Sequence, residues 1–358
     1  MRASLMKQTM MFMQEIELKF QIPDSSLDTV LSALNHLPDR PPVQRLQAAY
    51  FDTMSRKLAR ARAALRVRQE DEEWVQTLKA SAANPMIRLE DNVAATPPEE
   101  GGIIEPNLSL HHGDARISLQ RDLGWHPETD PQGRHCGLTQ LYRTDMHRHR
   151  AEFQVKGPDG HSLGWVELAV DLGSIHAGQQ SVRVQELEIE LVSGSPEAVL
   201  ACGRDWVERF GLWLDVQTKA HRGDQLARQA ASNTFAPAKP IRPRAKAPNW
   251  AAALHAITEQ ISFNMSELAS PSHHADFDKA PWQHAWLVGL RRLTLLLQAH
   301  PEHTATHGIL RQRAWHLFQQ TRQKTAAQCL PLARSHLASS LCLDLIALSL
   351  QTDTASTA

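Results

Sequence analysis

Apolar and polar residues alternate along much of the first two thirds of the chain. Alternation at every second position is the pattern of a β-strand whose two faces meet different surroundings. A Pro-Asp-Gly turn at residues 158–160 separates two of these segments and predicts a hairpin. The pattern predicts strands at residues 15–22, 64–69, 74–79, 87–92, 141–148, 152–156, 164–171 and 184–192. The first part of the chain is therefore expected to be rich in β-structure.

Two segments of this first part have the helical period instead. One follows Ser25 and Ser26, a pair that can cap a helix, and carries apolar residues at helical spacing from Leu27 to Leu34. The other runs from Pro196 to about Phe210. Residues 94 to about 137 are rich in Pro, Gly and His, which predicts mainly a long insertion.

The pattern changes after a proline-rich segment between Phe235 and Pro248. Its prolines alternate with Lys and Arg, a composition that favours an extended spacer. Beyond it, apolar residues such as Leu254, Ile257 and Ile261 recur at helical spacing. A chain of 358 residues is long enough for two domains. We therefore expect one domain over residues 13–228, a linker over 229–249 and a helical domain over 250–352.

Charge and cysteine content restrict the class of protein. Lys and Arg number 38 and Asp and Glu number 39, so the balanced chain indicates neither nucleic-acid nor membrane binding, and any anion site must be local. The four cysteines lack CxxC spacing, which suits a reducing compartment and predicts a cytoplasmic location. The best apolar run, residues 337–350, is shorter than the ~20 residues of a membrane span and predicts a buried helix. The sequence leaves the oligomeric state open.

Charged residues repeatedly share one face of the predicted strands. Residues 15–19 read Glu-Ile-Glu-Leu-Lys, and residues 186–190 read Glu-Leu-Glu-Ile-Glu. For any single strand, the ordinary explanation is a sheet with its charged face in water. Like charges two residues apart repel one another unless cations lie between them. The repeated pattern therefore favours a barrel whose charged faces turn inward around metal ions and basic side chains.

Such a lumen would bind a polyanion. Arginine holds phosphate oxygens in a two-pronged manner, and lysine supplies a point charge. Carboxylates hold hard divalent cations that bridge to phosphate oxygens, and one glutamate would orient or deprotonate the attacking water. Displacement at a terminal phosphorus needs mainly positioning and charge neutralisation. These residue types therefore indicate metal-dependent chemistry on a triphosphate.

Several motifs, in order, resemble the CYTH, or triphosphate tunnel metalloenzyme, superfamily. They are residues 15–19, similar to its ExExK signature; 50–68, similar to YFDT…L…LRxR; 77–79, similar to TLK; 88–92, similar to RxExN; 167–173, similar to ELALDxG; the acidic strand at 186–191; and 218–223, similar to SKAxRG. The likeness is nearly continuous from Met13 to about Gln225. It implies an α+β fold, with an antiparallel closed β-barrel (tunnel) and flanking helices, followed by an all-α helical domain.

The resemblance also implies roles for individual residues. Lys19 and Glu17 would be catalytic, and the cofactor would be Mg²⁺ or Mn²⁺. Asp52 and Thr53 are interpreted instead as a strand end beside a capped helix. The implied metal ligands are Glu15, Glu17, Glu90, Glu186, Glu188 and Glu190, and the implied substrate-binding cations are Lys19, Arg66, Arg68, Lys79, Arg88, Arg143, Lys219 and Arg222.

The C-terminal part resembles a CHAD domain, a helical phosphate-associated module often fused behind bacterial triphosphatases. Residues 284–293 are similar to its HQxRVxxRRL helix, although Leu287 stands where an arginine is expected. The region corresponds to about half of a usual CHAD domain. Polyphosphate binding and a packing role both stay open for it.

The fused architecture resembles the bacterial inorganic triphosphatases, which implies hydrolysis of inorganic triphosphate to pyrophosphate and phosphate. A class IV-type adenylate cyclase would use the same tunnel with added contacts to the base. A thiamine triphosphatase would need a stacking aromatic residue, for which Trp74 or Trp165 could serve. A non-enzymatic polyphosphate-binding protein is the alternative from a different class, although anion capture alone would not require the acidic set.

Overall fold

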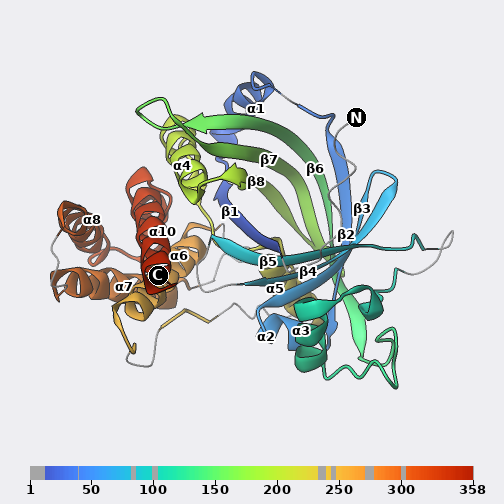
Figure 1. The fold of residues 1–358 in the computed structure, drawn as a ribbon. Helices are drawn as coiled ribbons and strands as arrows, with labels where there is room; N and C mark the ends of the chain where they lie inside the picture. Colours follow the sequence, from blue (N-terminus) through green and yellow to red (C-terminus); the bar gives the residue numbers. More distant parts are fainter. Residues whose placement is uncertain are drawn as a thin grey trace.

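Figure 1 shows the computed structural model of the chain, in which a curved β-sheet carries helices on its outer side and a group of helices lies beside it. The structure describes residues 13–38, 40–81, 86–98, 104–232, 239–242, 247–270, 278–299 and 304–357. Within these ranges, the side chains of residues 13, 14, 81, 88 and 352–357 are not described.

The described strands form a nine-stranded antiparallel sheet that closes on itself. Strand β1 (Met13–Gln21) closes the ring, because its first half pairs with β5 and its second half with β8. The order is β5-β4-β3-β2-β6-β7-β8-β1-β9, and the additional pairing joins β5 to β1. The predicted closed barrel is confirmed. The other strands are β2 (Gln44–Thr53), β3 (Ala63–Glu70), β4 (Glu73–Ser81), β5 (Ile87–Ala94), β6 (Leu138–Lys156), β7 (Ser162–Ala177), β8 (Gln180–Gly194) and β9 (Trp213–Leu214).

The predicted strands are present, with two differences. Residues 141–148 and 152–156 belong to one long strand, β6, which the predicted turn at 158–160 joins to β7. Strand β2 was not among the predicted strands, because nearly all of its residues are buried on both faces. A strand covered on both sides does not show the alternation from which the others were predicted.

Two helices were predicted within the barrel region, and both are present as α1 (Leu27–Asn35) and α4 (Pro196–Phe210). Ser195 caps the start of α4, because its hydroxyl accepts a hydrogen bond from the Glu197 amide at 3.2 Å. Its apolar side covers the outer face of the barrel, where Trp206 belongs to the same buried cluster as Phe20 and Ile189. The apolar side chains of the alternating strands thus point outward, toward the helices.

Other helices in this region were not predicted, apart from the one expected beside Asp52, which is α2. They are the short 3₁₀ helices η1 (Asp24–Ser26) and η2 (Leu108–Leu110) and the α-helices α2 (Lys57–Arg60), α3 (Gly113–Leu123) and α5 (Lys219–Ser232). Helix α3 lies in the segment that was read mainly as an insertion. Its Leu119 and Leu123 pack against Leu65 and Val67 of β3, so this segment covers another part of the outer face.

The interpretation of Asp52 as a structural residue is confirmed. Its carboxylate accepts hydrogen bonds from the amides of Leu58 at 2.9 Å and Ala59 at 3.0 Å, in the first turn of α2. These amides have no partner within the helix, so a carboxylate at this place stabilises the helix start.

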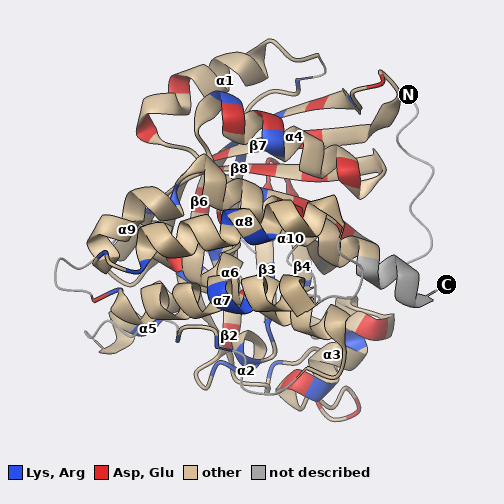
Figure 2. Ribbon diagram, turned by 90° about the vertical axis from the view of Figure 1, so that its left-hand side faces the viewer, with Lys and Arg blue, Asp and Glu red and all other residues tan. Residues whose placement is uncertain are grey.

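The rest of the described chain is helical, as predicted. It comprises α6 (Trp250–Ala269), α7 (Ala280–Ala299), α8 (Ala305–Thr321), α9 (Ala326–Ala333) and α10 (His336–Thr357), which includes the buried helix expected at 337–350. These helices face the viewer in Figure 2 and share one buried apolar cluster with α4. No helix among the described residues is long and apolar enough to span a bilayer. The division at residues 228 and 250 stays a prediction, and much of the predicted linker lies outside the described residues.

Candidate functional site

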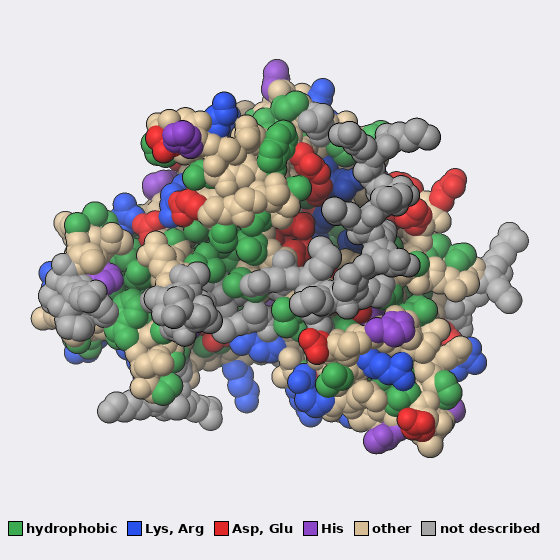
Figure 3. All heavy atoms as spheres, in the orientation of Figure 1, with side chains coloured by type: hydrophobic (Ala, Val, Ile, Leu, Met, Phe, Trp, Pro, Cys, Tyr) green, Lys and Arg blue, Asp and Glu red, His purple; other side chains and the backbone are tan. Residues whose placement is uncertain are grey.

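The charged side chains of the alternating strands point into the barrel. Directly opposite residues of antiparallel strands lie on the same face of a sheet. Glu17 is opposite Glu190, Glu190 is opposite Glu167, and Asp171 is opposite both Glu186 and Arg148. One polar face therefore continues from β1 across β8 and β7 to β6. In Figure 3, acidic and basic side chains gather beside one another over this part of the barrel.

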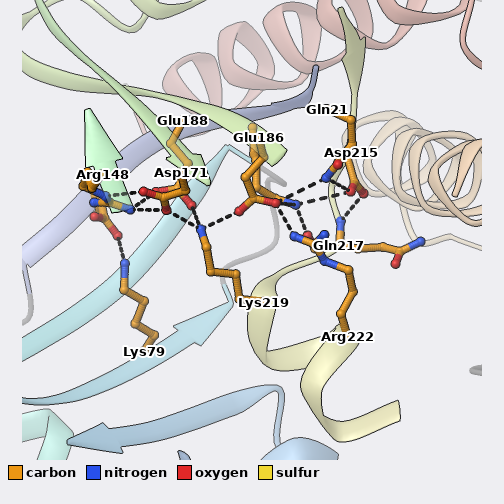
Figure 4. A network of polar contacts seen from close by, with 12 residues as sticks. Gln21, Lys79, Arg148, Asp171, Glu186, Glu188, Asp215, Gln217, Lys219 and Arg222 are labelled. Atoms are coloured by element: carbon orange, nitrogen blue, oxygen red, sulfur yellow. Dashed lines mark hydrogen bonds and ion pairs between the residues drawn. The ribbon is translucent and has the colours of Figure 1, made fainter. Parts of the chain in front are cut away.

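Three carboxylates form the densest part of this face. Asp171, Glu186 and Glu188 can each offer an oxygen atom that lies within 4.8 Å of the other two. Lys219 of α5 reaches all three, with its Nζ 2.7 Å from Asp171 and from Glu188 and in an ion pair with Glu186 (Figure 4). Arg148 donates to Asp171 at 2.7 Å and to Glu188 at 2.6 Å. Helix α5 and strand β6 thus supply the cations that neutralise the cluster.

Nearby cations offset the effect of burial on two of these carboxylates, Glu186 and Glu188. Burial alone would raise the pKa of Glu186, but Arg222, Lys19 and Lys219 hold the pKa of this group well below its usual range. Burial also acts on Glu188, whose pKa is nevertheless lowered by Lys219 and Arg148. Nearby cations therefore stabilise the negative charge of this acidic cluster.

A second charged group lies around Lys79 of β4. Its Nζ is 2.9 Å from Glu15 and 2.5 Å from Glu90, and Arg66 lies 3.9 Å from Glu90. Burial raises the pKa of Glu15 to about 9, with Glu17 and Glu90 adding to the rise and Lys79 opposing it. Lys79 and Arg66 lower the pKa of Glu90 despite burial. The pKa values of these two neighbouring carboxyl groups thus shift in opposite directions, because negative charge is closely packed here.

Glu17 and Glu190 continue the acidic face beside this group. Burial, opposed by Lys79 and aided by the nearby Glu17 and Glu167, raises the pKa of Glu190 to about 7. Both side chains are partly buried. The acidic residues of β1, β5 and β8 thus lie beside one another on the inner face of the barrel.

Lys19 lies at the other end of β1, against the segment that joins β9 to α5. Its side chain is 5% exposed, and its Nζ is 3.3 Å from Asp215 and 3.5 Å from Glu186. The same Nζ donates to the backbone carbonyl of Gln217. Arg222 of α5 pairs with Glu186 from the other side. Figure 4 shows this part of the network.

The structure brings most of the predicted site residues into one lumen. Arg68 also lies on the lumen face, where it pairs with Glu70, and burial beside Arg66 lowers its pKa to about 10. For Arg88 the backbone is described, opposite Glu15, but the side chain is not. The residues that meet in the lumen are Glu15, Glu17, Lys19, Arg66, Arg68, Lys79, Glu90, Glu186, Glu188, Glu190, Lys219 and Arg222.

The prediction for Arg143 is corrected by the structure. Arg143 is exposed on the outer face of β6, whereas Tyr142 and Thr144 on either side of it are buried on the inner face. Because side chains alternate along a strand, the inner positions of β6 are the even-numbered ones, which include Arg148 and Arg150. Arg148 is the arginine that joins the acidic cluster.

The lumen residues that were not predicted as site residues include Asp171, Arg148 and Asp215. Asp171 lies four residues after Glu167 on the same strand face, and this spacing could have identified it. Arg148 lies on one of the two faces of β6, but the sequence alone did not show which face turns inward. The pairing register of β6 with β2 and β7 decides this. Asp215 follows the two-residue strand β9 and shows no pattern of its own.

The side chains present fit a divalent metal ion. Hard cations prefer several oxygen ligands, and the three clustered carboxylates of Asp171, Glu186 and Glu188 supply oxygen donors. Their mutual repulsion is relieved by lysine and arginine, and a cation of higher charge would serve the same purpose. The buried acidic cluster can therefore hold a metal ion.

Several solved structures match the chain at low sequence identity. A Hippeastrum protein, named as a candidate adenylyl cyclase with a dominant triphosphatase activity, is 19% identical, with a TM-score of 0.41 over 62% of this chain and 98% of its own. A candidate adenylate cyclase from Bacillus halodurans is 16% identical, with a TM-score of 0.36 over 58% of this chain and 96% of its own. A conserved hypothetical protein from Pyrococcus furiosus is 13% identical, with a TM-score of 0.33 over 57% and 98%.

The match to a family model is broader than any single motif. The model of the CYTH domain matches residues 13–223, which is more than half of the 358-residue chain. The matched range contains all nine strands of the described barrel and the two cations that α5 contributes to the lumen. The chain therefore belongs to the CYTH domain family, whose members are generally metal-dependent enzymes that act on triphosphates.

Proposed function

We propose that this protein hydrolyses inorganic triphosphate to pyrophosphate and phosphate, in a metal-dependent reaction inside the barrel. The observation that carries the proposal is the contact of Lys219 with three clustered carboxylates. Lysine can bind phosphate and carboxylates can bind metal ions, and here the two kinds of side chain lie together. A lumen that captured anions alone would gain nothing from buried carboxylates. A lumen that binds a metal–triphosphate complex uses both.

Cations from several sides would hold the triphosphate. Arg66 and Lys79 come from β3 and β4, Arg148 comes from β6, and Lys219 and Arg222 come from α5. Each now lies against a carboxylate, and phosphate oxygens would take over part of these contacts when substrate binds. This distribution suits a small anion that carries charge along its whole length.

The acidic residues would hold the metal. Asp171, Glu186 and Glu188 form the clustered set of donors, and the acidic residues of β1 and its neighbouring strands would add further oxygen ligands. Mg²⁺ and Mn²⁺ suit such an oxygen-only environment. When bound, the ion neutralises charge on the triphosphate and polarises its phosphoryl oxygens.

Lys19 and Glu17 would act on the reacting groups. The Lys19 ammonium, fixed by Asp215 and the Gln217 carbonyl, would stabilise negative charge on the phosphoryl group. Glu17 would orient the attacking water and accept its proton. The bond from the water oxygen to the terminal phosphorus forms while the bond to the pyrophosphate oxygen breaks, and the departing pyrophosphate takes the electron pair.

Phosphate release tests the proposal directly. The protein is incubated with triphosphate, ATP, thiamine triphosphate or long-chain polyphosphate, each with and without Mg²⁺ or Mn²⁺, and cyclic AMP is measured in the ATP samples. Metal-dependent release that is fastest with inorganic triphosphate is expected. Cyclic AMP formation would indicate a cyclase, and binding of triphosphate without turnover of any substrate would indicate a polyphosphate-binding protein.

One structural feature keeps thiamine triphosphatase as the second candidate. Trp165 is 39% exposed and lies on β7 two positions before Glu167, at the end of the lumen face. An exposed indole at that place could stack on an aromatic ring. Trp74 packs against the apolar cluster under α3 and is less suited to this role.

A further inference from the structure

We infer that helix α6 of the C-terminal region positions Lys19, by holding the segment from Leu214 to Gln217 against it. The inference rests on the proposed function, since it assigns positioning residues to the same site. The positioning residues are Ser266 and Glu267 of α6 and Ser270 directly after it, and they touch no substrate. The helical region thereby supports the active site of the barrel.

The segment is bound tightly to Lys19 on one side. The Asp215 amide donates to the Lys19 carbonyl at 2.9 Å, and the Asp215 carboxylate and Gln217 carbonyl both accept from Lys19 Nζ. The Gln217 amide donates back to Asp215 at 2.9 Å. Asp215 and Gln217 are buried. Any shift of this segment would therefore move the groups that fix the ammonium.

On its other side the segment is bound to α6. The Val216 amide donates to the Ser266 hydroxyl at 3.0 Å, and the Gln217 side-chain amide donates to the Ser270 hydroxyl at 3.2 Å. Ser266 is 1% exposed, so no solvent competes for this bond. Val216 lies between Asp215 and Gln217, the two residues that hold Lys19. Ser266 therefore holds this segment in place directly.

The same turn of α6 also contacts the start of α5. The Glu267 carboxylate accepts from the Gln225 side chain at 3.3 Å and lies 3.3 Å from His221 Nε2. His221 stands between Lys219 and Arg222, the two cations that α5 contributes to the lumen. One helical turn therefore contacts both the segment that holds Lys19 and the helix that brings Lys219 and Arg222 to Glu186.

The last turn of α6 is itself fixed. Its final carbonyls have no partner within the helix. Lys279 donates to the Glu267 carbonyl at 2.7 Å, and Arg334 donates to the Ala269 carbonyl at 2.7 Å. The Arg334 guanidinium also lies over the ring of Trp213 in β9, 4.5 Å from its centroid. The helical region thus fixes the turn from which Ser266 and Ser270 project.

The test compares two buried serines of the same helix. Ser266→Ala removes the acceptor of the Val216 amide, whereas the control Ser262→Ala removes a hydroxyl that donates to the Thr258 carbonyl within α6. Both serines are 1% exposed. Because Ser266→Ala loses the hydrogen bond from the Val216 amide, kcat should fall about three- to tenfold, and KM should change less than kcat. Ser262→Ala should stay within about twofold of the wild type.

A second measurement does not depend on turnover. Acylation of lysines with an amine-reactive reagent, followed by peptide mass spectrometry, reports the accessibility of Lys19. Ser266→Ala should increase labelling of Lys19 several-fold over the wild type and over Ser262→Ala, and Ser270→Ala should give a smaller increase. Equal Lys19 labelling in Ser266→Ala and Ser262→Ala would overturn the inference. If no triphosphate is hydrolysed by the wild type, the proposed function fails while the labelling comparison still decides the positioning role.

Discussion

The guanidinium of Arg148 meets the carboxylate of Asp171 in a two-pronged ion pair, with both nitrogen–oxygen distances at 2.7 Å. The two residues are direct cross-strand partners in β6 and β7, and Asp171 is 1% exposed. A planar guanidinium matches a carboxylate or a phosphate equally well. The same arginine can therefore neutralise the acidic cluster and bind a substrate phosphate.

The first prediction uses the two arginines on β6. Arg148→Ala should lower kcat/KM for triphosphate by about 100-fold or more, because it removes a cation from the lumen. Arg148→Lys should restore part of the loss. Arg143→Ala, on the exposed outer face of the same strand, is the matched control and should stay within about twofold of the wild type. Steady-state kinetics measures all three, and an equal loss in both alanine variants would contradict the assignment.

The second prediction concerns the two proposed catalytic residues. Lys19→Ala and Glu17→Ala should each abolish measurable turnover, because the charge and the water-orienting group that they supply are not duplicated at the same positions. Folding should be largely retained, since the apolar cluster outside the barrel is unchanged. Phosphate release and far-ultraviolet circular dichroism measure the two properties. Unchanged rates in both variants would exclude these roles.

The third prediction concerns metal removal. A chelator should abolish turnover, and added Mg²⁺ or Mn²⁺ should restore it. Asp171→Asn should weaken Mn²⁺ binding by about tenfold or more, measured by calorimetry, because an amide is a poorer ligand for a hard cation than a carboxylate. The control is Asp145→Asn on neighbouring β6, where the carboxylate pairs with Arg45 near the surface. Mn²⁺ binding that is unaffected by Asp171→Asn would remove this residue from the metal site.

The fourth prediction tests how closely α5 fits the barrel. A Cβ at Gly223 would lie 2.2 Å from the ring of Tyr142, which is buried and stacked on Tyr50 with ring centroids 4.7 Å apart. Gly223→Ala should therefore cost about 1–3 kcal/mol of unfolding free energy and lower activity, because the displaced helix carries Lys219 and Arg222.

The control for this helix is Gly308→Ala in α8. A Cβ at Gly308 would meet no atom within 4 Å, so the helix propensity of alanine should leave stability unchanged or raise it by about 0.5–1 kcal/mol. Thermal unfolding compares the two variants. If Gly223→Ala is as stable and as active as the wild type, α5 is not held by this contact.

The sequence by itself determined the local structure and the inventory of the lumen. Alternation predicts which residues of one strand share a face, because the backbone geometry of a strand fixes that period. Residues 15–19 and 186–190 therefore identified charged faces before their partners were known. The helical period likewise predicted α4, α6 and α7, since each has an apolar side to bury.

Only the tertiary structure decided how these faces meet. Pairing of β1 with β5 closes the barrel, and the register of β6 places Arg148 inside and Arg143 outside. Helix α5 brings Lys219 to Glu186, and the segment after β9 brings Asp215 to Lys19. These contacts join residues far apart along the chain. Local pattern cannot specify them, because they depend on strand register and on helices packing against surfaces that form only when the barrel closes.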